Sequence, residues 1–163
     1  DQRLCVPFGT HVTIDLNGFT LTSSAVSTIY TSGVCIVKDG TVTNTTDGKA
    51  AVMNIGTVAF ENCTLTANNY YPLYNYCTAT VTDSTLNGNY NGNSICNQQA
   101  YSDTVTLTLS GTMCMAGGIY NSYAASVVTV LPGTYNFDPT SYVDADAYTV
   151  TDNDDGTWSV TAK

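Results

Sequence analysis

The sequence has little charge, and almost none of it is positive. Only 10% of the 163 residues are Asp, Glu, Lys or Arg, whereas an average soluble domain has about 25%. Four Lys and Arg residues stand against thirteen Asp and Glu residues, which gives a net charge of −9. A chain with so few cations cannot assemble the basic patch that binds nucleic acid or an anionic membrane surface. We therefore expect no nucleic-acid partner.

The sequence also lacks helical periodicity and long apolar runs. No segment of about 10–15 residues has apolar residues at helical spacing, and no run approaches the roughly 18 apolar residues of a membrane span. Helical repeats, leucine-rich repeats and membrane insertion are therefore not expected. The hydrophobic content of 43% is still sufficient for a core, and the length is that of one domain.

A strand–turn–strand unit, in contrast, recurs along the whole chain. Its first copy is residues 12–22, in which apolar residues alternate on both sides of an Asn-Gly turn. The small residues at successive turns lie 21 to 27 residues apart. A period of about 20–30 residues is typical of a solenoid, and without helices it indicates a parallel β-helix. These small residues are Gly18, Gly40, Cys63, Ser84, Gly111 and Gly133.

We predict an all-β, single-domain, right-handed parallel β-helix of about six coils over residues 1–147. A C-terminal β-hairpin over residues 148–163 packs on the solenoid or caps it. Neighbouring coils are expected about 4.8 Å apart. The turn-rich segment 87–93 accounts for the one long interval. The residues expected in one corner column are Gly40, Ser84, Gly111 and Gly133.

Two segments resemble known β-helix proteins. Residues 15–21, Asp-Leu-Asn-Gly-Phe-Thr-Leu, resemble the first-coil pattern of the pectate-lyase-like superfold. Residues 132–143 together with 154–160 resemble the closing segment of adhesin-like bacterial surface proteins of that fold. The resemblance implies a secreted or wall-displayed protein, often part of a longer one. The start of the chain almost inside a strand indicates either a trimmed mature protein or such a part.

Six cysteines beside so little charge favour an oxidising, extracellular or cell-surface location. Cys77 and Cys96 are about one coil apart, and we predict that they form a disulfide. The alternative is that some of the cysteines are buried as small free thiols.

Tyrosines are the most unusual surface feature. Aromatic faces bind sugars and also pack subunits, so a tyrosine-rich face is a candidate site for carbohydrate or a protein partner. The alternative is that stacked tyrosines only form the wall of the solenoid. The candidate residues are Tyr70, Tyr71, Tyr74, Tyr76 and Tyr90, with Tyr101, Tyr120 and Tyr123 as further members.

Candidate catalytic and metal-binding groups are few. A polysaccharide lyase needs a base, and a hydrolase needs paired carboxylates, but His11 is the only histidine. Four carboxylates precede the turns and, if stacked, would form an acidic ladder able to hold a cation; exposed strand ends are the favoured alternative. We predict no catalytic residue, metal or cofactor. The carboxylates are Asp15, Asp39, Glu61 and Asp83.

Each end of an open solenoid exposes unpaired backbone groups. The candidate assembly edges are Leu4, Cys5 and Val6 in the first coil, and Val150, Trp158 and Val160 in the hairpin. The predicted function is a non-catalytic extracellular structural protein, as an adhesin-like stalk or a filament subunit. A carbohydrate-binding module and a polysaccharide lyase or hydrolase are the alternatives. The expected partners are copies of the chain or surface glycans.

Overall fold

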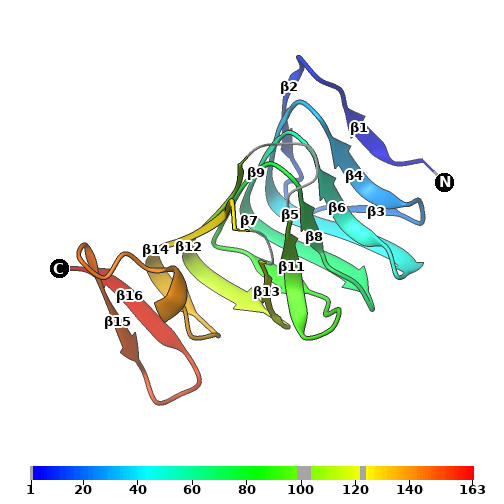
Figure 1. Ribbon diagram of the computed structural model, residues 1–163. Coiled ribbons are helices and arrows are strands. Elements are labelled where there is room, and N and C mark those ends of the chain that lie inside the picture. The colour runs from blue at the N-terminus through cyan, green and yellow to red at the C-terminus, as the bar shows by residue number, and fades with distance from the viewer. Residues whose placement is uncertain (1, 99–103, 122–123) are drawn as a thin grey trace.

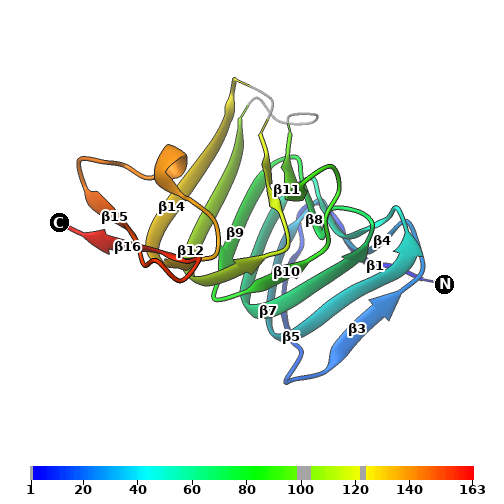
Figure 2. The same cartoon turned by 90° about the horizontal axis from the view of Figure 1, so that it is seen from below.

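The chain winds into a β-solenoid of about five stacked turns (Figures 1 and 2). The computed structural model describes residues 2–98, 104–121 and 124–163. From β1 to β14, each strand pairs in parallel with an equivalent strand of an adjacent coil. The N-terminus and the C-terminal hairpin lie at opposite ends of the solenoid (Figure 1). The predicted all-β parallel β-helix is therefore confirmed.

Each coil contributes strands to two sheets. The six-stranded sheet, which we call the first face, contains β1 (Leu4–Val6), β4 (Ser27–Thr31), β6 (Ala50–Asn54), β8 (Leu73–Asn75), β11 (Asn93–Asn97) and β13 (Gly118–Tyr120). The ten-stranded sheet contains β2 (His11–Asp15), β3 (Thr20–Ser23), β5 (Val34–Asp47), β7 (Thr57–Asn68), β9 (Thr78–Thr82), β10 (Thr85–Asn87), β12 (Val105–Met115) and β14 (Ser126–Tyr135), followed by the hairpin strands.

A column of left-handed residues divides the ten-stranded sheet into two faces. The second face holds β2, β9 and the first parts of β5, β7, β12 and β14, and the third face holds β3, β10 and the remaining parts. Asn, Asp and Gly adopt positive φ at the lowest cost, so they occupy this corner. The residues are Asn17 (φ 46°), Asp39 (55°), Asn62 (52°), Asp83 (48°) and Gly111 (70°).

The predicted column of small residues is confirmed for part of its length. Gly40 pairs with Cys63, whose backbone N–H donates to Ser84 Oγ at 3.1 Å. Gly111 does not continue this column, because β12 has one additional residue at the corner, and Gly111 instead stacks on Asp83. Gly133 pairs with Gly111 and is displaced with it. The prediction is therefore wrong for these last two glycines.

Close approach of the coils explains why Gly40 and Gly133 are glycines. A Cβ atom on Gly40 would lie 2.4 Å from Leu16 Cβ. A Cβ atom on Gly133 would lie 2.0 Å from the carbonyl oxygen of Gly111. Neither position has room for a side chain.

The sixth predicted coil does not close. After β14 the chain passes through a short 3-10 helix, η1 (Thr140–Tyr142), and enters the hairpin of β15 (Tyr148–Asp152) and β16 (Trp158–Ala162). β16 pairs antiparallel with β14, so the chain reverses direction instead of returning to the first face. The predicted hairpin is therefore formed, but the solenoid has about five turns instead of six.

The core consists of columns of apolar residues inside the coils. On the first face Ile29, Val52, Leu73 and Ile95 lie directly over one another and are completely buried. Burying one such side chain contributes about 1.5–3 kcal/mol. The strand alternation found in the sequence thus corresponds to inward and outward positions. On the other two faces the column residues include Val37, Phe60, Val81, Leu109 and Val130, and Val42, Leu65 and Leu86.

A ladder of buried asparagines occupies the corner between the first and second faces. Asn54 Nδ2 donates to Asn75 Oδ1 at 2.7 Å, and Asn75 Nδ2 donates to Asn97 Oδ1 at 2.7 Å. Asn97 Nδ2 continues the chain to Asn121 Oδ1 at 3.0 Å. The same amides bond backbone groups at the turn, for example the carbonyl of Thr78. The ladder satisfies polar groups that the corner buries.

We predict that Asn75→Ala destabilises the fold strongly, because it leaves the amides above and below without their partner. The free energy of unfolding should fall by about 3 kcal/mol. Denaturant unfolding followed by circular dichroism measures this. Asn87→Ala, an exposed asparagine on β10, is the matched control and should change stability by less than about 0.5 kcal/mol. Equal effects of the two variants would contradict the structural role of the ladder.

Candidate functional site

The five predicted tyrosines come together in one cluster, which we call the tyrosine patch. Ring centroids are 5.2 Å apart for Tyr70 and Tyr71, 5.5 Å for Tyr71 and Tyr74, and 4.7 Å for Tyr74 and Tyr76. Tyr90 joins from the following coil, with its ring centroid 5.1 Å from that of Tyr70. Pairs range from stacked to edge-to-face, which is how aromatic rings prefer to meet.

Two turns and one strand position the patch. Tyr74 lies on β8 and points outward, since its neighbours Leu73 and Asn75 are buried. Tyr90 belongs to the turn-rich insertion, where its backbone N–H and carbonyl both bond Asn93. The insertion packs tightly on the turn before β8: a Cβ atom on Gly88 would lie 2.8 Å from the Pro72 ring.

The patch has an exposed part and a buried part. Tyr90 is 41% exposed, whereas Tyr71 is 7% exposed. Burial raises the pKa of Tyr71 to about 12 and also raises the pKa values of Tyr70 and Tyr74. The Tyr74 hydroxyl donates to Gln98 Oε1 at 3.4 Å. At neutral pH these phenols are therefore uncharged, and they offer ring faces together with hydroxyl groups. Tyr120 is exposed on β13, and Tyr101 and Tyr123 lie outside the described residues.

An outward column on the first face continues from the patch toward the N-terminus. Tyr74 pairs with Met53, and Met53 pairs with Tyr30. The guanidinium carbon of Arg3 lies 4.5 Å from the centre of the Tyr30 ring, a cation–π contact. The column ends at Cys5 on β1. This face is therefore rich in aromatic and sulfur side chains over its whole length.

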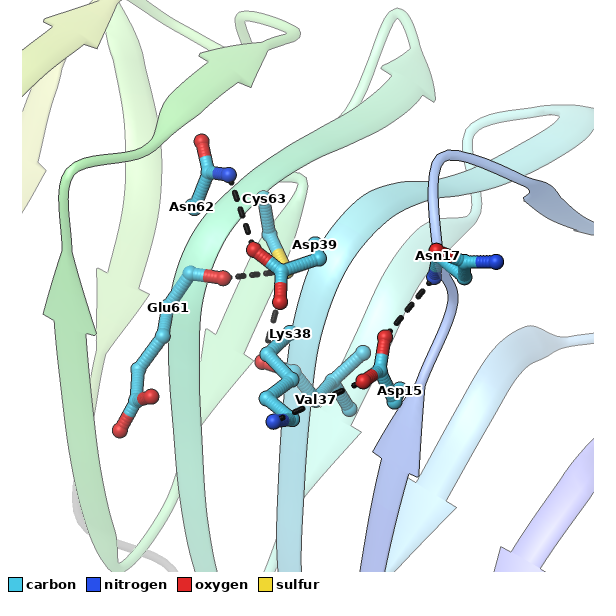
Figure 3. A network of polar contacts seen from close by, with 8 residues as sticks. All are labelled: Asp15, Asn17, Val37, Lys38, Asp39, Glu61, Asn62 and Cys63. Carbon is cyan, nitrogen blue, oxygen red and sulfur yellow. Dashed lines mark hydrogen bonds and ion pairs between the residues drawn. The ribbon is translucent and has the colours of Figure 1, made fainter.

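The four carboxylates considered as a possible acidic ladder do not converge on a shared site. Figure 3 shows three of the four carboxylates, Asp15, Asp39 and Glu61. The fourth, Asp83, accepts a hydrogen bond from the backbone N–H of Thr112 at 2.7 Å. Asp15 lies 3.6 Å from Lys38 Nζ, and Asp39 accepts a hydrogen bond from Asn62 Nδ2 at 2.9 Å. The Glu61 carboxylate points away from this network (Figure 3). Among the described residues no group of three or more His, Cys, Asp or Glu is placed to hold a metal ion.

The acidic residues near the C-terminus form turns. Asp144, Asp152 and Asp155 each accept a hydrogen bond from the backbone N–H two residues further on. This is the local pattern of an Asx turn. Hydrogen bonds from the Thr157 hydroxyl and backbone lower the pKa of Asp155, which stays charged on the surface.

The predicted disulfide between Cys77 and Cys96 is not formed, and all six cysteines are free. The register explains the error. Cys96 pairs with Tyr74, three residues before Cys77, which corresponds to about 10 Å along an extended strand. A disulfide requires Cα atoms within about 7 Å. Burial raises the pKa values of Cys35 and Cys96 to about 11, so these thiols act as small apolar side chains.

Only some of the candidate assembly residues lie on a strand at the end of a sheet. β1, which carries Leu4, Cys5 and Val6, ends the six-stranded sheet, although the Val6 side chain is buried. At the other end the outermost strand is β15, which carries Val150. β16 lies between β14 and β15, so Trp158 and Val160 are not on an open edge, and Val160 belongs to the core.

A groove of about 410 Å³ that the sequence did not suggest follows the corner between the first and second faces. Its walls come from the equivalent turns of successive coils and include Phe8, His11, Ile55 and Cys77. Phe8 is 89% exposed at one end. No Asp, Glu, Lys or Arg belongs to the described residues that line it.

The fold defines the class of this protein, a parallel β-solenoid, and the comparisons do not narrow it further. No protein-family model, curated protein or solved structure matches the chain. In the described part of the chain no helix is long and apolar enough to cross a membrane.

We predict that the thiols differ sharply in reactivity. Cys5 and Cys114 are exposed and should react with an aromatic disulfide reagent under native conditions. Cys35, Cys63 and Cys96 are buried and should react only after unfolding. Mass spectrometry of the labelled protein assigns each site. Labelling of Cys35 at the same rate as Cys5 would contradict the packed core.

We also predict that stability falls at alkaline pH. The raised pKa values of Tyr70, Tyr71 and Tyr74 mean that the folded state binds these protons more tightly than the unfolded state. Their contribution is complete below about pH 10 and is lost as pH rises through the folded-state values. Chemical unfolding between about pH 9 and 12 measures the decline. Tyr71→Phe should make the decline shallower, and an unchanged slope would contradict the assignment.

Proposed function

We propose that this protein is a non-catalytic, adhesin-like surface module that binds carbohydrate through the tyrosine patch. The observation that supports this most directly is the convergence of five tyrosines from two coils on one face. Sugar rings stack their C–H surfaces on aromatic faces, and phenol hydroxyls donate and accept hydrogen bonds to sugar hydroxyls. The patch supplies both kinds of contact without charge.

The scaffold behind the patch lowers the entropic cost of binding a ligand. β8 is held between β6 and β11, and Leu73 and Asn75 anchor it in the core and the asparagine ladder. Side chains that are already ordered lose little conformational freedom when a ligand binds. A rigid solenoid also separates its two ends by a constant distance, which suits a stalk.

An extracellular location is part of the proposal and rests on two features of the sequence. One is the resemblance of residues 132–143 and 154–160 to closing segments of surface proteins. The other is the composition of the chain, which is rich in Thr, Asn and Tyr and poor in charge. The cysteines do not add support, because none of them is bridged.

A filament subunit is the second candidate. β1 and β15 each end a sheet, and they lie at opposite ends of the molecule (Figure 1). An open strand edge pairs readily with another chain, and head-to-tail pairing of unlike ends continues without closing. Sedimentation of the purified protein distinguishes the two candidates, because a monomer at micromolar concentration would exclude the filament function.

We predict that Tyr90→Ala and Tyr70→Ala each weaken binding on a glycan array by roughly tenfold, the loss expected for about 1.4 kcal/mol of stacking. Phe19→Ala is the matched control, since Phe19 is 72% exposed at another corner and should not affect binding. Equal binding by all variants would exclude the patch. Release of reducing or unsaturated sugars from the bound glycan would contradict a non-catalytic function.

A further inference from the structure

A second surface has a regularity that the tyrosine patch does not. Threonines point outward at two positions on each of the strands β3, β5 and β7, and at one position on β10. They form two columns of four positions on the third face, of which seven are Thr. We call this array the threonine grid. One column is Thr20, Thr41, Thr64 and Thr85, and the other is Thr22, Thr43, Thr66 and Asn87.

The backbone determines the spacing of the grid. The pairs Thr20–Thr41, Thr41–Thr64 and Thr64–Thr85 are in direct register, and no bulge interrupts the pairing within the grid. Neighbouring strands are about 4.8 Å apart, and residues two apart on a strand are separated by about 6.7 Å. The hydroxyl and methyl groups therefore repeat in two dimensions. Figure 2 shows β3, β5, β7 and β10 side by side.

The grid is chemically uniform and its side chains are not engaged elsewhere. None of its eight positions carries a charge. In the described part of the chain no hydrogen bond involves the hydroxyl of any of its seven threonines, whereas threonines at other corners bond backbone carbonyls. The inward residues between the two columns are Leu21, Val42, Leu65 and Leu86, which hold the strands to the core.

The second face of the same solenoid provides an internal comparison. It too has many outward threonines, but Thr82 Oγ1 pairs with Ser110 Oγ at 2.8 Å. One of its columns also contains the ion pair of Lys38 with Asp15, followed by Glu61. Charged and mutually bonded side chains interrupt the regularity of this face. Among the described residues of these two faces, the third face alone combines register, uniform chemistry and unengaged hydroxyls.

We propose that the threonine grid binds ice. Its two repeat distances are close to those between water oxygens on a prism face of hexagonal ice. Hydroxyls at these positions can occupy or bond lattice sites, while the methyl groups between them order the adjacent water. The solenoid core holds the side chains in place before binding, so the surface loses little entropy when it meets a crystal.

The geometry does not fit a protein partner equally well. Protein interfaces depend on a few large anchors such as Trp, Tyr and Arg set in pockets, and the grid contains none of these. It is instead a periodic surface, and its natural complement is another periodic surface. A crystalline polysaccharide is the other ligand of this kind, and the experiment below includes it.

The test introduces bulk in the centre of the grid. The double variant Thr41→Lys with Thr64→Lys places two long charged side chains on adjacent strands. The matched control, Thr80→Lys with Thr108→Lys, makes the same change at a paired position on the second face. Both pairs are outward, half-buried threonines without side-chain hydrogen bonds among the described residues. Thermal unfolding of both variants establishes that they remain folded.

Two measurements follow on the purified chain: the fraction of protein taken up by a slowly growing ice hemisphere, and the gap between melting and freezing temperatures of a seed crystal. We expect uptake by the original protein and by the control. Uptake of the grid variant should fall by roughly tenfold or more. Exclusion of the original protein from ice, or equal uptake of both variants, would overturn the proposal. Grid-dependent binding to crystalline cellulose or chitin without uptake by ice would overturn it as well.

This proposal is independent of the carbohydrate site. Tyr90→Ala, which should impair glycan binding, leaves the third face unchanged and should be taken up by ice like the original protein. Loss of both activities in that variant would indicate a general structural defect, and its thermal unfolding would show it. Loss of ice uptake in a Tyr90→Ala variant that remains folded would contradict the assignment to the threonine grid.

Discussion

In-register stacking of parallel coils is the constraint on which the rest of this structure depends. Strands about 4.8 Å apart place each residue directly over its equivalent in the next coil. A side chain at any position must therefore be compatible with a similar side chain above and below it. Gly40 illustrates the strictest case, since a Cβ atom there would collide with Leu16 of the adjacent coil. The same stacking converts a repeat of about 22 residues into continuous columns.

Columns of polar residues provide hydrogen bonds to buried backbone groups, which columns of apolar residues cannot do. Where the chain turns at the end of the first face, its backbone groups are removed from water. Asn54, Asn75 and Asn97 are fully buried there, and each amide bonds its neighbours in the ladder while the ladder also bonds the backbone. An asparagine has both donors and an acceptor, so it can stack on itself without leaving a group unpaired. Thr31 pairs with Asn54 and extends the column by one position, and its single hydroxyl donates to the carbonyl of Gly33 at 3.3 Å.

The two proposed binding surfaces differ in how regularly the coils stack: one follows the repeat, and the other lies where an insertion interrupts it. The threonine grid exists because three consecutive coils place Thr at the same two positions. The fourth coil adds Thr85 at one of these positions. The tyrosine patch exists because the repeat is broken, since an inserted turn places Tyr90 against residues of the preceding coil. A regular surface suits a periodic ligand, and an irregular aromatic surface suits a single sugar chain. The solenoid keeps the two surfaces on different faces.

The amino-acid sequence by itself determined the architecture, because the period, the strand alternation and the Asn-Gly and Asp-Gly turns are local properties. It also identified the members of the tyrosine patch by their composition, and the hairpin by its turn. The asparagine ladder could have been found from the spacing of Asn54, Asn75 and Asn97, which recur once in each coil. Only the tertiary structure decided the lateral register: it separated Cys77 from Cys96, shifted Gly111 from the column of small residues, placed β16 inside the sheet and stopped the solenoid at about five turns. The physical reason is that register depends on the length and geometry of every preceding turn, and a difference of one residue gives each side chain a different neighbour.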